Sequence, residues 1–159
     1  MLHIKLVCLG KLKEKYWQAA EAEYLKRLSA FAKVEIIELK EESFDDKMPA
    51  QMIKETEARL LKNALNKFQD AYIVALDERG KQFFSIDFSK KLSDLALSGN
   101  SNFVFVIGGP LGLDESILKM AKLKLSFSLF TFTHQMIRVF LLEQIYRAMM
   151  IESGRQYHY

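Results

Sequence analysis

The apolar residues of this 159-residue chain switch repeatedly between a strand-like and a helix-like spacing, and this alternation limits the possible folds more than any single motif. Short apolar or alternating runs, each long enough for one strand, occur at 2–9, 34–39, 71–76, 102–107 and 123–128. The run at 71–76 is apolar throughout, which is typical of a strand buried on both faces. These runs predict a sheet whose centre is covered on both sides.

Between and after these runs, apolar residues recur at steps of three and four, which predicts amphipathic helices. The predicted helices cover residues 14–31, 49–68, 85–98, a short segment after 114, and 134–151. Pro49 suits the first turn of its helix, and Ser85 and Asp114 can cap theirs. Strands that alternate with helices predict a parallel sheet with helices on both faces, which is an α/β fold.

The length of the chain predicts a single domain over residues 1–159. No uncharged stretch resembles a membrane-spanning helix, and the one cysteine, Cys8, cannot form an internal disulfide. A reducing compartment and a cytoplasmic protein that is not bound to a membrane are therefore expected. Since no pair of Cys or His residues has the spacing of metal ligands, no metal is expected.

The net charge of +3 is distributed unevenly along the chain. Residues 1–34 and 119–159 each carry a net charge of +4, whereas residues 35–118 carry −5. Basic ends suit a polyanionic partner such as nucleic acid. Simple solvation of the charged side chains explains the pattern equally well, so charge alone leaves both interpretations open.

A glycine-rich turn, Gly108-Gly109-Pro110-Leu111-Gly112, follows the strand predicted at 102–107. A dinucleotide-binding turn requires Gly-x-Gly-x-x-Gly and an acidic residue about twenty positions later, and the sequence has neither. The phosphate-binding motif of nucleotide hydrolases is also absent. An NAD-linked enzyme is therefore a weak alternative.

Three strand ends carry loops of unusual composition, and ligands of parallel sheets bind at the carboxyl ends of strands. The loops lie in ALDERGK (75–81), IGGPLG (107–112) and FSLFTFTH (127–134). The third loop is aromatic and nearly uncharged, so it could enclose an apolar planar ring while its backbone hydrogen-bonds the edge of the ring. Core filling is the alternative for any one of these loops taken alone.

The last predicted helix has apolar residues around most of its circumference, which indicates burial on more than one face. Ile137, Phe140 and Leu141 can face the sheet, whereas Val139 and Ile145 lie on other sides. Because one sheet covers only one face, a second copy of the chain is the predicted cover, and two-fold dimers are the commonest oligomers. Burial under the C-terminal tail is the alternative.

Three segments carry a family resemblance: VIGGPLGLDE, LSFSLFTFTHQMIRVFLLEQIYRAMMI and the terminal YHY. They resemble the SPOUT, or α/β-knot, methyltransferases, and most closely the ribosomal RNA large subunit methyltransferase H family. LGKLKEKYWQAAEAEYLKRL and LDERGK are also similar to that family, so the resemblance covers the whole chain in order. It implies a C-terminal trefoil knot, a homodimer, and S-adenosylmethionine bound by the knotted loops. It further implies methyl transfer to N3 of pseudouridine 1915 in 23S ribosomal RNA, on the large subunit of the ribosome.

The resemblance also implies roles for individual residues. Family contacts to the cofactor correspond to Leu76, Gly108, Phe127, Ser128, Leu129, Phe130, Thr131 and Phe132. His158 is the candidate general base because an unshifted imidazole titrates near neutral pH, with Tyr157 as a hydrogen-bonding group. Arg147 is the candidate group for holding an anion, although Glu143 lies one helical turn before it and can pair with it. The candidate RNA contacts are Lys11, Lys13, Lys15, Arg138 and Arg155.

Two positions depart from the family pattern. Thr133 stands where members usually have proline, and its hydroxyl can cap the last helix instead. The chain ends in Tyr159, where members commonly have a basic residue, so a phosphate contact there is weakened. The alternative from another functional class is a non-catalytic RNA-binding dimer that retains the nucleotide pocket.

Overall fold

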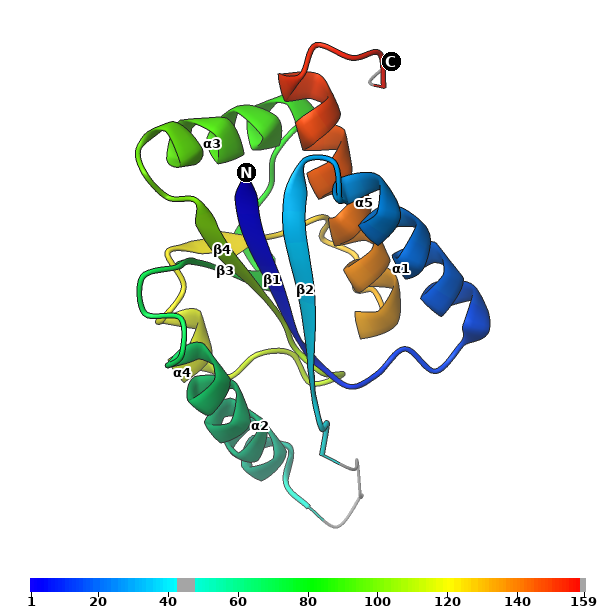
Figure 1. Ribbon diagram of the computed structural model, residues 1–159. Helices are drawn as coiled ribbons and strands as arrows, with labels where there is room; N and C mark the ends of the chain where they lie inside the picture. Colours follow the sequence, from blue (N-terminus) through cyan, green and yellow to red (C-terminus); the bar gives the residue numbers. More distant parts are fainter. Residues whose placement is uncertain (43–47, 158–159) are drawn as a thin grey trace.

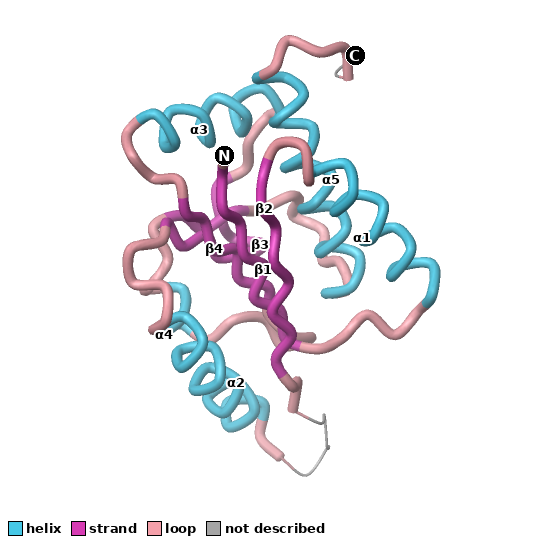
Figure 2. The backbone as a smooth tube through the Cα atoms, viewed as in Figure 1, coloured by secondary structure: helices cyan, strands magenta, loops and turns pink. Residues whose placement is uncertain are grey.

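The computed structural model describes residues 1–42 and 48–157 and contains five parallel strands in one sheet (Figure 1). The strands are β1 (Leu2–Leu9), β2 (Ala32–Leu39), β3 (Tyr72–Lys81), β4 (Asn102–Ile107) and β5 (Leu123–Leu125). Their spatial order is β2-β1-β4-β3-β5, and each neighbouring pair is parallel. The predicted parallel α/β fold is confirmed. Because the strands are parallel, their carboxyl ends point the same way, and β1 and β2 end at the lower end of the sheet in Figure 2.

The helices cover both faces of the sheet. They are α1 (Lys15–Leu28), α2 (Ala50–Leu65), α3 (Ser85–Leu97), α4 (Glu115–Leu118) and α5 (His134–Glu152). On one face, α1, α3 and α5 pack on alternate strand residues such as Leu6 and Phe105. On the other face, α2 and α4 pack on Val7 and Val106. Alternate residues of β1 and β4 therefore serve two separate apolar layers. The run 71–76 was predicted to be buried on both faces, and it does the same: Val74 lies in the first layer, and Ile73 and Ala75 lie in the second.

Several boundaries differ from the sequence prediction. β5 ends at Leu125 rather than at 128, because the chain then turns to reach α5. β3 continues to Lys81 instead of ending at 76. Ser85 does not cap α3: its hydroxyl donates a hydrogen bond of 3.0 Å to Gln144 Oε1 on α5. By contrast, Asp114 caps α4 as predicted, and Thr133 caps α5 by accepting a hydrogen bond from the Met136 amide.

The sequence argument for a dimer assumed that only the sheet covers α5, and that assumption is wrong; the dimer itself stays a prediction. Helix α5 lies between α1 and α3 and also packs on the sheet, so three sides have partners from the same chain. Leu141, Leu142 and Ile145 are fully buried as a result. The sequence analysis counted only the sheet as a cover for α5 within the chain. No local sequence pattern shows that α1 and α3 pack beside α5.

The extended part of β3 lies beside the edge strand β5. Leu125 pairs with both Leu76 and Lys81, so the register between β3 and β5 shifts between these two residues. A Cβ atom added to Gly80 would lie 2.7 Å from the backbone of Lys124. Glycine is required at this position because two backbone segments touch there.

No helix in the described ranges is long and apolar enough to cross a membrane.

Candidate active site

A cavity of about 920 Å³ opens at the carboxyl ends of β3, β4 and β5. Its wall is built from segments 76–79, 107–113, 125–128 and 130–135, together with Ile137 and Lys54. This volume falls within the range of about 300–1,000 Å³ that is usual for small-molecule sites. The three loops singled out in the sequence therefore line one shared cavity.

Seven of the eight residues predicted to contact a cofactor line this cavity, namely Leu76, Gly108, Phe127, Ser128, Phe130, Thr131 and Phe132. The eighth, Leu129, is not part of the wall, and its side chain is 85% exposed. The geometry thus brings the predicted residues together. Which ligand they contact remains a prediction.

The glycine turn after β4 forms one side of the cavity. Gly112 has a φ of +75°, which favours glycine, and its amide donates a hydrogen bond of 3.0 Å to the Gly109 carbonyl. A Cβ atom on Gly108 would lie only 3.0 Å from the Gly112 backbone. The turn is therefore tight, and its backbone faces the cavity without side chains in between.

The aromatic loop forms the opposite side. Ser126 donates a hydrogen bond to the Ser128 carbonyl, and Ser128 Oγ in turn accepts one from the Phe130 amide, both at 3.0 Å. Phe132 packs edge-to-face on Phe140 of α5, with ring centroids 5.6 Å apart. Phe130 is 80% exposed although it borders the cavity. The backbone of this loop is ordered by its serines, and its aromatic side chains stay at the mouth.

Two charged residues at the cavity were not predicted individually. The Asp77 carboxylate accepts hydrogen bonds from the Arg79 amide at 2.8 Å and from Arg79 Nε at 3.1 Å. Burial alone would raise the pKa of Asp77, but the hydrogen bonds and charge of Arg79 outweigh burial and lower it. An ionised carboxylate and an exposed guanidinium therefore stand together at the mouth. The motif LDERGK contained both residues, but their pairing depends on the turn after β3.

Glu57 on α2 is a second residue that sequence analysis missed. It is only 3% exposed, and its Oε1 accepts a hydrogen bond from the Glu42 amide at 3.3 Å. A Cβ atom on Gly109 would lie 3.2 Å from Glu57 Oε1, so the carboxyl group lies against the glycine turn. Burial raises the pKa of Glu57, and the nearby Glu41 and Glu42 act in the same direction. Nothing in the spacing of residues along α2 distinguished Glu57 in the sequence.

The C-terminal candidates lie far from this cavity in the same chain. Arg147 donates to Glu143 Oε1 through Nη2 at 2.6 Å, and its guanidinium stacks over the Tyr157 ring at 4.8 Å. Helix α5 begins at the cavity and has 19 residues, which at a rise of about 1.5 Å per residue is about 28 Å. The end of α5 lies at the end of the sheet where β1 begins (Figure 1). His158 and Tyr159 lie outside the described residues.

Burial raises the pKa of Tyr157 to about 12, with a further contribution from the Tyr24 hydroxyl group. Tyr157 therefore stays a neutral phenol near neutral pH and can donate a hydrogen bond. Its hydroxyl lies 3.4 Å from Glu143 Oε1. Glu143, Arg147 and Tyr157 form one polar cluster at the far end of α5.

The candidate RNA contacts separate into three groups. Lys11 and Lys13 are exposed in the connection that leaves the carboxyl end of β1, on the same edge of the sheet as the cavity, and Lys15 is the exposed first residue of α1. Arg155 lies at the opposite edge, where its guanidinium stacks over the Phe31 ring at 5.5 Å. Arg138 belongs to neither group.

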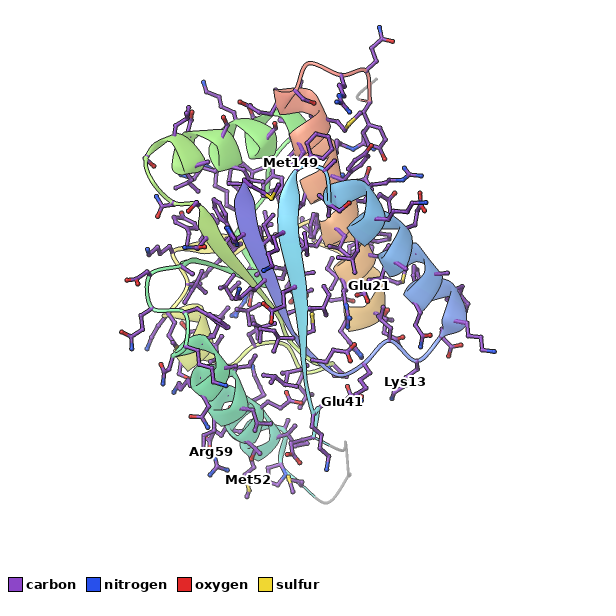
Figure 3. The ribbon with its side chains drawn as sticks, in the orientation of Figure 1. Lys13, Glu21, Glu41, Met52, Arg59 and Met149 are labelled. Carbon is purple, nitrogen blue, oxygen red and sulfur yellow. The ribbon has the colours of Figure 1, made fainter. Side chains whose placement is uncertain are left out.

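The prediction that Arg138 contacts RNA is wrong for this structure, because the residue is only 3% exposed. Its Nε pairs with Glu21 of α1, and its Nη1 donates to Glu38 Oε1 of β2 at 2.9 Å. Figure 3 shows Glu21 between α1 and α5. Glu21 and Glu38 are both distant from Arg138 in sequence, so the periodicity of α5 could not predict that Arg138 is buried and paired with them.

Among residues 1–42 and 48–157, no group of three or more His, Cys, Asp or Glu side chains could hold a metal ion.

Comparison with known proteins assigns the chain to a family. The family model described as "Predicted SPOUT methyltransferase" matches residues 2–158. The protein named ribosomal RNA large subunit methyltransferase H from Lactobacillus johnsonii is 45% identical over 160 residues, covering 99% of each chain. The protein of the same name from Streptococcus equi subsp. zooepidemicus is 47% identical, again with 99% of each chain covered.

A solved structure supports the fold independently. The probable methylase family protein from Haemophilus influenzae Rd KW20 aligns with a TM-score of 0.59 at 12% identity, covering 98% of this chain and 70% of that one. At this identity the likeness concerns the fold alone. The match of the family model and the full-length relatives carry the assignment: the chain belongs to the SPOUT family of S-adenosylmethionine-dependent methyltransferases.

Proposed function

We propose that this protein transfers a methyl group from S-adenosylmethionine to N3 of pseudouridine 1915 in 23S ribosomal RNA, acting on ribosomes in the cytoplasm. The observation that carries the proposal is the shared cavity, to which residues 76–79 of β3 and the loops after β4 and β5 all contribute. The curated relatives that match the full chain are named as large-subunit ribosomal RNA methyltransferases, which supports this substrate class.

The cavity fits S-adenosylmethionine chemically. Leu76, Phe127 and Ile137 supply apolar surface for the adenine ring, while the glycine turn offers backbone polar atoms without intervening side chains. The charged pair Asp77–Arg79 stands at the mouth, where the polar end of such a ligand would meet solvent. The bound cofactor would supply an electrophilic methyl group, and the residues of the chain would orient it and exclude water.

A trefoil knot is the proposed topology of the cavity walls. Helix α4 lies on one face of the sheet, and α5, which follows β5, lies on the other. The register of β3 against β5 shifts between Leu76 and Lys81, and α5 packs between α1 and α3. A chain that leaves β5 and passes beneath the β3–α3 connection to reach the position of α5 would form a knot. The close contact at Gly80 supports this path.

We propose a homodimer in which the C-terminal tail of one protomer serves the cavity of the other. Within one chain, the ten residues from Ile137 at the cavity to Arg147 span about 15 Å, too far for one bound nucleotide to reach both groups. Met136 and Phe140 leave a half-exposed apolar stripe on the outer side of α5. A second copy packed on this stripe would cover it and bring its own tail to the cavity.

The chemistry of the acceptor suits the proposed groups. N3 of pseudouridine carries a proton that must be removed for the nitrogen to attack the methyl carbon. His158 is proposed as the general base, Tyr157 as a hydrogen-bond donor to the uracil ring, and Arg147 as the cation facing the developing anion. Lys11, Lys13 and Lys15 at the cavity edge and Arg155 on the tail would contact RNA phosphates.

The test is transfer of isotopically labelled methyl groups from S-adenosylmethionine to purified ribosomes, followed by mass mapping of the RNA. Incorporation at a single pseudouridine is expected, and His158→Ala should abolish it while S-adenosylhomocysteine still binds. RNA binding without methyl incorporation would instead support the non-catalytic dimer. Stabilisation by NAD but not by S-adenosylhomocysteine would indicate a different cofactor.

A further inference from the structure

One carboxylate joins the lysine-bearing connection to the wall of the cofactor cavity. Glu41 follows β2, and its Oε1 lies 3.3 Å from Lys13 Nζ. Its other oxygen lies 3.7 Å from His134 Nε2, and His134 lines the cavity at the start of α5. The next residue of α5, Gln135, accepts a hydrogen bond of 2.9 Å from the Lys13 amide. Figure 3 shows Lys13 and Glu41 near each other below α1.

The backbone at Gly10 shows that this arrangement is tightly packed. Gly10 has a φ of +84°, and an added Cβ atom would lie 2.8 Å from Glu41 Oε2 and 3.2 Å from His134 Nε2. The positive φ favours glycine at this position, and the ends of both side chains lie close to its backbone. A side chain at position 10 would therefore point into the space that the Glu41 carboxylate and the His134 imidazole occupy.

His134 Nε2 is the unusual member of this group. It is buried and has no hydrogen-bond partner among the described residues. The carboxylate of Glu41 is slightly beyond hydrogen-bonding distance and is shared with Lys13. A buried nitrogen without a partner is costly, so in the tautomer whose Nε2 carries the ring proton a small movement of Glu41 toward His134 would supply an acceptor.

We propose that Glu41 is a positioning residue that couples RNA contact at Lys13 to cofactor binding at the start of α5. This inference rests on the proposed function. An RNA phosphate that draws the Lys13 ammonium away leaves the Glu41 carboxylate free to engage His134. The first turn of α5, which forms part of the cavity wall, is then held more firmly, so RNA and cofactor each strengthen the binding of the other.

Thermodynamic linkage fixes the form of the test, because two ligands that are coupled must change each other's affinity by the same factor. The dissociation constant of S-adenosylhomocysteine is measured by equilibrium dialysis without RNA and with saturating purified ribosomes. For the unmodified protein, ribosomes should tighten binding about fivefold, at the lower end of usual coupling factors. Glu41→Gln should reduce that factor to less than about twofold while changing the RNA-free affinity little.

Glu35→Gln is the matched control. Glu35 lies within β2 and also pairs with a lysine, with its Oε2 3.2 Å from Lys5 Nζ, but its side chain is 56% exposed and does not line the cavity. This variant should keep the full coupling factor. Melting temperatures close to that of the unmodified protein would show that both variants fold.

The inference is overturned if Glu41→Gln retains the full coupling factor or if ribosomes leave the affinity of the unmodified protein unchanged. Failure of the proposed function looks different. In that case the unmodified protein binds no S-adenosylhomocysteine, or transfers no methyl group to ribosomes, whatever residue stands at position 41.

Discussion

Replacing Arg138 by methionine tests the account of how α5 is held against the rest of the fold. The arginine is 3% exposed and pairs with Glu21 and Glu38, which belong to α1 and β2. Methionine fills a similar volume but leaves both carboxylates without their cation. The first turns of α5 also line the cofactor cavity, so the effect should reach the site.

The size of the effect follows from the burial of the three side chains. Removing one partner of a buried ion pair typically costs about 3–5 kcal/mol, because the remaining charge stays buried. The side chains of Glu21 and Glu38 are 15% and 30% exposed, so solvent relieves part of this cost and about 3 kcal/mol is expected. For a domain of this size, that loss lowers the melting temperature by about 6–12 °C.

The assay is thermal unfolding followed by circular dichroism at neutral pH. Arg138→Met combined with Glu21→Gln and Glu38→Gln should recover much of the loss, because the unpaired charges are removed as well. A single Arg138→Met variant that melts within about 2 °C of the unmodified protein would refute the buried-pair reasoning. If that variant also bound ribosomes more weakly, Arg138 would instead be a surface contact to RNA.

Three further predictions concern single positions. Burial raises the pKa of Cys8 to about 12, so its thiol should not react with a thiol reagent at pH 8 until the protein unfolds; rapid labelling of the native protein would contradict this. Burial raises the pKa of Glu57, so the stability it contributes is present below its unfolded pKa and is lost as pH rises through its folded pKa. Glu57→Gln should therefore be more stable than the unmodified protein in urea at pH 8, with a gain that shrinks toward pH 4; a gain independent of pH would show that the carboxyl charge is not responsible. Gly80→Ala should cost about 1–3 kcal/mol in urea unfolding, because the added methyl group would lie 2.7 Å from the Lys124 backbone, and an unchanged midpoint would contradict that contact.

Much of the fold could be predicted because its determinants are local. The apolar runs of β1 and β4 and the caps at Asp114 and Thr133 each depend on a few neighbouring residues. The position of the cavity also followed from a local rule, since parallel strands end at one edge and three loops of unusual composition follow them.

What could not be predicted depends on contacts between distant segments. Arg138 stands in a regular helical pattern, and only the fold brings Glu21 and Glu38 to it. The burial of Glu57 against the glycine turn has the same cause, because α2 and the β4 loop meet only in three dimensions. The covering of α5 by its own chain likewise required the positions of α1 and α3.

The central claim is that residues 76–79 of β3 and the loops after β4 and β5 form one binding site for the methyl donor. A crystal structure with S-adenosylhomocysteine tests this claim most directly. The account predicts the ligand between Leu76, Gly108 and Phe127, with the adenine ring among their apolar groups and backbone atoms. A ligand bound elsewhere, with this cavity still filled by solvent, would contradict it.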